Sequence, residues 1–224
     1  SFTIDSTAAS LVETSAIDSS TNDSTPDYTF VSSEAGTITY SGSCSSNTTS
    51  ASAGANTITL NSLSEGTYSD CKITVTDSLN NAVTLSLSSF EIDTTAPTVT
   101  TFTTTADNQS AVAVTDNMTV TFSEAMDNTT VTTNTDNTSC SGTLRVSSDN
   151  FSSCIQMSSS SPVSSDYITF ILDPSDNLTG GTTYLTRVTT GVTDSSGNAL
   201  SNQYDNSTGF TTSSSSSDRW SSSI

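Results

Sequence analysis

Apolar and polar residues alternate along most of this chain with a period of two. Representative stretches are Tyr28-Thr-Phe30, Ile38-Thr-Tyr40, Ile58-Thr-Leu60, Ile73-Thr-Val75, Met118-Thr-Val120-Thr-Phe122 and Ile168-Thr-Phe170-Ile-Leu172. This period puts successive side chains on opposite faces of a β-strand, and the intervening threonines suit the face in contact with water. Clusters of Gly, Asn, Asp and Ser separate the stretches, as in an antiparallel sandwich. No segment keeps an apolar period of 3.6 residues over three turns, so the sequence predicts an all-β protein.

One phrase occurs twice in the chain. The first copy joins Leu63-Ser-Glu-Gly-Thr-Tyr68 to Val75-Thr-Asp-Ser-Leu-Asn-Asn-Ala82, and the second joins Leu178-Thr-Gly-Gly-Thr-Thr-Tyr184 to Val192-Thr-Asp-Ser-Ser-Gly-Asn-Ala199. In each copy a turn precedes a tyrosine on a long strand, and a hairpin follows that is rich in residues tolerating positive φ. The tyrosines are at the place of a tyrosine corner, although they could also be ordinary core aromatics. The repetition indicates two sandwich domains in series, over residues 10–96 and 97–212.

The opening octapeptide repeats a later segment. Residues 1–8, Ser-Phe-Thr-Ile-Asp-Ser-Thr-Ala, match residues 89–96, Ser-Phe-Glu-Ile-Asp-Thr-Thr-Ala, at six of eight positions. We interpret the later copy as the closing strand of the first domain, with Phe90 and Ile92 pointing inward. A strand over residues 1–9 then has no domain before it to close, and an unpaired strand is a template for pairing with another chain.

Three interpretations of this strand stay open. Phe2 and Ile4 could complete the sandwich of a neighbouring subunit, which would build a head-to-tail polymer. The chain could instead be cut from a longer tandem array, or the strand could fold back onto the first domain.

The second domain resembles a known family. The matching phrases are Val120-Thr-Phe-Ser-Glu-Ala-Met-Asp127, the segment from Leu178 to Tyr184, and the segment from Val188 to Leu200, and they resemble bacterial Ig-like domains of the S-layer and surface-adhesin type. Residues 10–96 resemble a more generic bacterial Ig-like repeat that ends at a joint between tandem domains, and residues 140–154 look like an insertion. The resemblance implies two Ig-like antiparallel β-sandwiches in tandem that act as a stalk, spacer or coat module. It implies no catalytic or ligand residues.

Composition narrows the functions further. The chain has 224 residues, of which 49 are Ser and 45 are Thr, and its formal net charge is -19. Such a charge repels phosphate backbones and anionic membrane surfaces, so we expect no nucleic-acid partner. No segment approaches the roughly 20 apolar residues that span a bilayer, and we expect neither membrane insertion nor a signal peptide. With no His and one Lys, general-base chemistry loses its usual groups, so we expect no enzyme.

Four cysteines indicate the compartment. Their even number and local spacing predict the disulfides Cys44–Cys71 and Cys140–Cys154, which form in an oxidising environment. Zinc is the alternative, but no CxxC pair or histidine accompanies them. We therefore expect an extracellular or cell-surface protein, in which each disulfide contributes about 3 kcal/mol to stability.

Other candidate sites are weaker. Calcium could bind near turns and joints, although the six aspartates concerned form no calcium-loop motif and are equally typical of solvated turns: Asp93, Asp107, Asp116, Asp173, Asp176 and Asp194. No other cofactor is expected. Nine asparagines begin an Asn-x-Ser/Thr triplet, where the Ser/Thr content alone gives about seven by chance: Asn22, Asn47, Asn108, Asn117, Asn128, Asn137, Asn150, Asn177 and Asn206. An isopeptide cross-link would need a buried lysine, whereas the strand period predicts that Lys72 faces water.

The serine-rich tail, residues 213–224, is expected to be a linker unless Trp220 anchors it to a partner. Together these observations favour an extracellular structural protein, a subunit of a cell-surface filament or stalk assembled head-to-tail by β-strand complementation. Its partners would be copies of itself or flanking Ig-like repeats. The alternatives are an excised repeat of a large adhesin that binds a surface or glycan, and an accessory module of a secreted enzyme.

Overall fold

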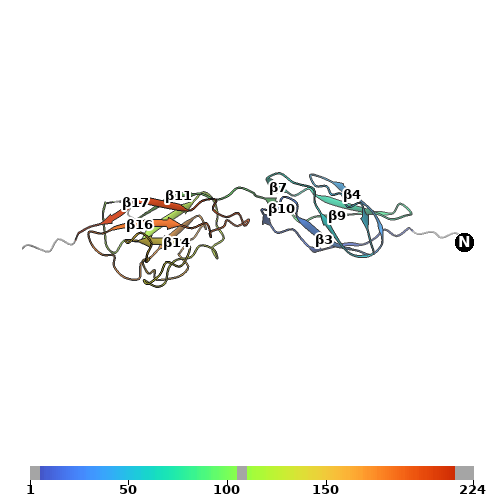
Figure 1. Cartoon of the computed structure of the whole chain (residues 1–224). Coiled ribbons are helices and arrows are strands. Elements are labelled where there is room, and N and C mark those ends of the chain that lie inside the picture. Colours follow the sequence, from blue (N-terminus) through green and yellow to red (C-terminus); the bar gives the residue numbers. More distant parts are fainter. Residues whose placement is uncertain (1–5, 105–109, 215–224) are drawn as a thin grey trace, which may run out of the picture. The chain divides into compact units, whose positions relative to one another are not determined.

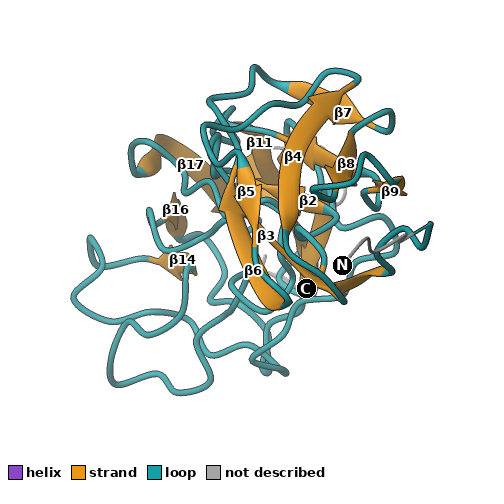
Figure 2. Cartoon of the chain, turned by 90° about the vertical axis from the view of Figure 1, so that its right-hand side faces the viewer, coloured by secondary structure: helices purple, strands orange, loops and turns teal. Residues whose placement is uncertain are grey.

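The computed structural model describes residues 6–104 and 110–214 and is all-β there, as the alternation predicts (Figure 2). No helix capable of crossing a membrane occurs within these ranges. The chain divides into two compact units, Ser1–Thr95 (unit 1) and Ala96–Ile224 (unit 2). The division falls one residue before the boundary expected from the sequence.

Over its described residues, 6–95, unit 1 contains three small sheets. Their strand orders are β1 (Leu11–Ser15), β3 (Asp27–Ser32), β6 (Gly54–Thr59); β2 (Ser20–Thr21), β10 (Phe90–Ile92), β7 (Gly66–Tyr68); and β5 (Ser50–Ala51), β4 (Gly36–Ser41), β8 (Lys72–Thr76), β9 (Ala82–Ser86). All pairings are antiparallel except that of β10 with β2, which is parallel.

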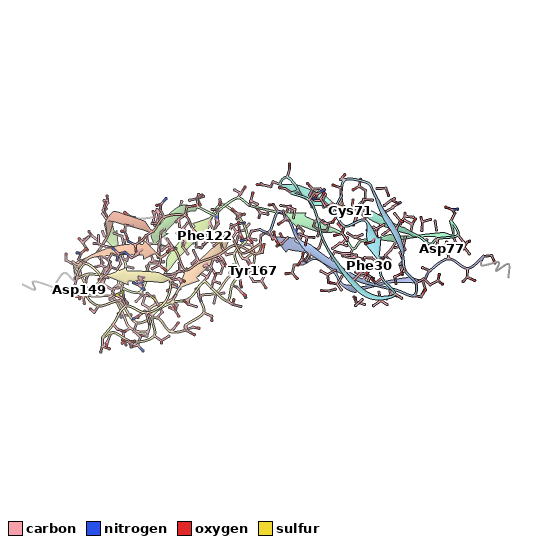
Figure 3. The ribbon with its side chains drawn as sticks, turned by 45° about the vertical axis from the view of Figure 1, so that its right-hand side comes forward. Phe30, Cys71, Asp77, Phe122, Asp149 and Tyr167 are labelled. Atoms are coloured by element: carbon pink, nitrogen blue, oxygen red, sulfur yellow. A yellow bond between two sulfur atoms is a disulfide. The ribbon has the colours of Figure 1, made fainter. Side chains whose placement is uncertain are left out.

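The strand period explains the core of unit 1. Alternate residues of β3 and β8 are buried, among them Phe30 and Val75, and Ile58 of β6 joins them in the core. Figure 3 shows Phe30 within this unit and Asp77 at the tip of a hairpin at its edge. The intervening threonines are at least partly exposed, and Lys72 is exposed as predicted. Burial of apolar area therefore comes from one face of each strand, which suits a chain with few apolar residues.

The expected long strand after Tyr68 is interrupted in unit 1. β7 ends at Tyr68 and β8 begins at Lys72, and the two strands belong to different sheets. Asp70, in the gap, accepts hydrogen bonds from the backbone N–H and the hydroxyl of Ser43 at 3.1 and 3.0 Å. Cys71 forms a disulfide with Cys44. These contacts fix the crossing from one sheet to the other.

Unit 2 is a sandwich of two sheets. One has the order β11 (Val99–Thr104), β13 (Met118–Phe122), β15 (Thr169–Leu172), and the other has the order β12 (Ser110–Val112), β17 (Tyr204–Thr212), β16 (Thr183–Val188), β14 (Leu144–Ser147). Side chains of both sheets, such as Val120 and Phe210, meet in one buried core. Strands β14, β16 and β17 lie side by side in Figure 1. The pairing of β12 with β17 is parallel, and the other pairings within the two sheets are antiparallel.

Candidate functional site: the closing strands and their joint

The closing strand of unit 1 is β10. Phe90 is opposite Tyr68 on β7, with ring centroids 5.4 Å apart and planes 14° from parallel. Phe90 and Ile92 are 1% and 0% exposed, whereas Glu91 between them faces solvent. The inward orientation predicted for Phe90 and Ile92 is confirmed. β10 also pairs with β2 on its other side, so both of its edges are hydrogen-bonded.

The residues that follow β10 are fixed by two carboxylates. Thr95 donates its backbone N–H to an Asp93 carboxylate oxygen at 3.0 Å, and its hydroxyl lies 2.8 and 2.9 Å from the two carboxylate oxygens of Glu65. Thr94 donates its hydroxyl to Glu65 as well, at 3.2 Å. Glu65 directly precedes β7, so the end of the closing strand and the start of its partner are joined by side-chain hydrogen bonds.

Unit 2 repeats this arrangement. Phe210 of β17 stacks on Tyr184 of β16, with centroids 5.5 Å apart and planes 24° from parallel. Just as β10 pairs with β2, β17 pairs in parallel with β12. Each unit therefore contains its own closing strand, in place and with partners on both edges.

Both tyrosines bond the turn that precedes their strand. The Tyr68 hydroxyl donates to the Ser64 carbonyl at 2.8 Å, and the Tyr184 hydroxyl accepts from the Thr179 backbone N–H at 2.9 Å. The interpretation as tyrosine corners is confirmed for both. Tyr184 is 2% exposed. These hydrogen bonds give both tyrosines a structural role.

The two hairpins of the repeated phrase have the same hydrogen bonds. Asp77 accepts from the backbone N–H groups of Leu79 and Asn81 and from the Asn81 side-chain amide. Asp194 accepts from the equivalent groups of Ser196 and Asn198. The residue three positions after each aspartate has positive φ, 67° at Asn80 and 92° at Gly197. The turn chemistry predicted from the sequence is confirmed in both copies.

Both predicted disulfides are formed. Cys44–Cys71 and Cys140–Cys154 have Cα–Cα distances of 5.2 and 4.9 Å. The first joins the loop after β4 to the loop before β8. The second closes the segment that contains β14.

The aspartates considered for calcium differ in their contacts. Asp93 and Asp194 bond their own turns, and Asp107 lies outside the described residues. Asp173 and Asp176 line one polar hollow of about 580 Å³ in unit 2. Asp116 accepts from the Asn117 backbone N–H, beside that hollow. Calcium binding by these groups stays a prediction.

The remaining candidate residues differ in accessibility. Of the nine triplet asparagines, Asn117 and Asn206 are partly buried, Asn108 lies outside the described residues, and the other six are exposed: Asn22, Asn47, Asn128, Asn137, Asn150 and Asn177. Phe2, Ile4 and Trp220 also lie outside the described residues. Ala9 is buried in unit 1, and Ser10 exchanges two hydrogen bonds with Ser33, so the segment next to the octapeptide packs on this unit.

One cluster in unit 2 was not predicted. Arg145 and Arg187 are opposite each other on β14 and β16, with Phe151 over Arg187. The sequence does contain a signal for the pair, because Leu144-Arg-Val146 and Thr186-Arg-Val188 each put an arginine on the outer face of a strand.

Comparison with known proteins gives one family. A family model described as the bacterial Ig-like domain matches residues 93–212, just over half of the chain, and the match agrees with the resemblance noted in the sequence. No curated protein matches the chain.

Proposed function

Because the chain belongs to the bacterial Ig-like domain family, we propose that it is a structural module of an extracellular or cell-surface protein, in which such sandwiches follow one another. Two disulfides support this location, since they persist in oxidising compartments. The proposed role is mechanical: each unit is a stable, hydroxyl-rich spacer, and the role requires no catalytic group.

The observation that supports the assembly is the environment of β10. Residues 89–96 close unit 1 by stacking Phe90 on Tyr68 and by burying Ile92. Residues 1–8 have the same apolar residues at the same spacing, with Phe2 for Phe90 and Ile4 for Ile92. They differ at two positions only. Thr3 replaces the exposed Glu91, and Ser6 replaces Thr94, whose hydroxyl function a serine retains.

We infer that the octapeptide closes a further Ig-like sandwich by strand addition. Within the described residues, the closing positions of both units are filled by β10 and β17. A filament made of this chain alone would therefore need a copy from which one of these strands has left its sheet. A flanking sandwich that uses the octapeptide as its own closing strand needs no such displacement, so we favour the flanking repeat as the partner.

Whether the octapeptide sequence can act as a closing strand is testable within this chain. The double variant E91T/T94S converts residues 89–96 into the sequence of residues 1–8. We expect its free energy of unfolding, followed by urea denaturation, to stay within about 0.5 kcal/mol of the wild type. The matched control F90A removes the ring and should destabilise unit 1 clearly. A double variant as unstable as this control would contradict the proposal.

Electron microscopy of the purified chain distinguishes the two possible partners of the octapeptide, a flanking repeat and another copy of this chain. Dispersed particles support the flanking repeat. Fibres that disappear in the variant F2S/I4S would support head-to-tail complementation between copies of this chain. Fibres that persist in that variant would contradict any assembly role for the octapeptide.

A further inference from the structure

Two arginines face each other on the outer surface of unit 2. Arg145 of β14 and Arg187 of β16 are register partners in an antiparallel pair. The residues on either side of each arginine are buried, so both side chains extend from the solvent face of the sheet. Directly opposite residues have Cβ atoms about 5 Å apart, and like charges in this position destabilise a sheet. The chain has only four basic residues among 224, so this pairing requires an explanation.

Only part of this positive charge is neutralised within unit 2. The next strand places Asp205 opposite Arg187, with Arg187 Nε 2.6 Å and Nη2 3.3 Å from the two carboxylate oxygens. Arg145 donates Nε to the Gly142 carbonyl at 3.0 Å and forms no ion pair within the described ranges. The row Asp205–Arg187–Arg145 therefore has a net charge of +1. The N–H groups of the two terminal guanidinium nitrogens of Arg145 are therefore available to a ligand.

An aromatic ring is held against Arg187 at a conformational cost. The Arg187 guanidinium carbon lies 3.9 Å from the centroid of the Phe151 ring. Phe151 has φ 63°, and Asn150 before it has φ 59°. Positive φ is rare for a bulky side chain, and such outliers concentrate at functional sites.

The segment that carries Phe151 is fixed at several points. The buried Ser147 hydroxyl accepts the Phe151 backbone N–H at 2.9 Å, and Asp149 accepts from the hydroxyl and backbone N–H of Ser153. The Cys140–Cys154 disulfide closes the segment, residues 140–154, which the sequence suggests is an insertion. Figure 3 shows Asp149 and Tyr167 at opposite ends of unit 2. The insertion thus brings Arg145 and Phe151 to Arg187.

We propose that Arg145 and Arg187 form an anion site that binds the carboxylate of a uronic acid in an extracellular polysaccharide. Guanidinium groups are planar forks that bind carboxylates in a bidentate manner. The Arg187 side chain is 23% exposed, whereas Asp205 and Gln203 beside it are exposed, so a ligand would approach the pair from their side. Asp205 and the exposed Gln203, whose amide lies 2.9 Å from Asp205, provide an acceptor and an amide for sugar hydroxyls. A simple inorganic anion would gain little from them.

The test is a titration of the isotope-labelled full chain with trigalacturonate, followed by the NMR signals of the arginine Nε–H groups, at about 0.1 M salt, where the repulsion from the net charge of -19 is screened beyond about 10 Å. We expect saturable shifts at Arg145 and Arg187. The variant R145Q should bind about tenfold more weakly, the loss expected for one charge-assisted hydrogen-bonding group. The matched control K72Q removes an equal charge from the surface of unit 1 and should bind like the wild type.

Several results would overturn the proposal. These are the absence of saturable shifts, an equal loss in R145Q and K72Q, and equal binding of neutral trigalactose. Saturable binding of inorganic sulfate without binding of trigalacturonate would show an inorganic anion site only and would refute the sugar assignment.

The disulfide gives an independent test. The variant C140S/C154S releases the segment that positions Phe151 and should weaken trigalacturonate binding several-fold, whereas C44S/C71S in unit 1 should leave it unchanged. Unchanged binding in C140S/C154S would contradict the role of the insertion. Neither experiment depends on the octapeptide, so this proposal can fail while the proposed function stands.

Discussion

Phe90 lies against Tyr68 on the neighbouring strand, with the two rings stacked 5.4 Å apart. The same pair occurs in unit 2 between Phe210 and Tyr184 at 5.5 Å. In both units the phenylalanine belongs to the closing strand, and the tyrosine hydroxyl bonds the preceding turn. One stacked pair therefore joins the last strand of each sandwich to a turn formed much earlier in the chain.

Removal of either phenylalanine ring should destabilise its own unit. Phe90 and Phe210 are each 1% exposed, and we expect F90A and F210A to lower the free energy of unfolding by about 3–5 kcal/mol. Urea denaturation measures the change. The control L79A alters a side chain that is 50% exposed at a hairpin tip and should have little effect. Similar losses in all three variants would contradict the assigned role of the pair.

Gly209 should tolerate replacement less well than Gly54, another glycine with positive φ. The φ of Gly209 is 63°, and an added Cβ would clash with the Tyr184 carbonyl oxygen. Gly54 has φ 102°, and an added Cβ would meet nothing within 4 Å. We expect G54A to cost about 1–2 kcal/mol from backbone strain alone and G209A to cost clearly more, as measured by thermal unfolding. An equal cost would mean that the β17 backbone moves to accommodate the methyl group.

The two disulfides should stabilise different units. They join residues 27 and 14 positions apart, and loop closure predicts about 3–4 and about 3 kcal/mol, respectively. Reduction should therefore lower both unfolding transitions. C44S/C71S should affect only unit 1, and C140S/C154S only unit 2, which fluorescence or NMR probes in each unit can resolve. A single variant that destabilises both units would show that they unfold together.

Asp149 should make unit 2 sensitive to acid. Hydrogen bonds from the hydroxyl and backbone N–H of Ser153 and from the Ser147 hydroxyl lower the pKa of Asp149 from 3.8 to about 2. Because the folded pKa lies below the unfolded one, this group contributes its full stabilisation above about pH 4 and loses it as the pH falls towards 2.

The variant D149N isolates this contribution. It should be less stable than the wild type at neutral pH, and the difference should disappear near pH 2. The relief of self-repulsion that acid brings to a chain of charge -19 affects both proteins equally and cancels in the comparison. A difference that does not change with pH would show that the charge of Asp149 contributes nothing.

Structural features that depend on residues close together in the sequence were predictable. The period of two identified Phe30, Val75 and Val120 as core residues, because pleating alone decides which face a side chain occupies. The Asp77 and Asp194 turns followed from bonds between residues at most four positions apart. The short cysteine spacings indicated both disulfides.

Relations between distant strands needed the tertiary structure. The cluster of Arg145 and Arg187 was not predicted, because only the pairing of β14 with β16 sets the two arginines opposite each other. Likewise, the break between Tyr68 and Lys72 results from bonds to Ser43 and Cys44, which lie on another loop. The sequence by itself thus determined the faces of the strands, the turns and the disulfides. Tertiary structure decided which strands are neighbours and in what register, because that choice depends on packing a whole core at once.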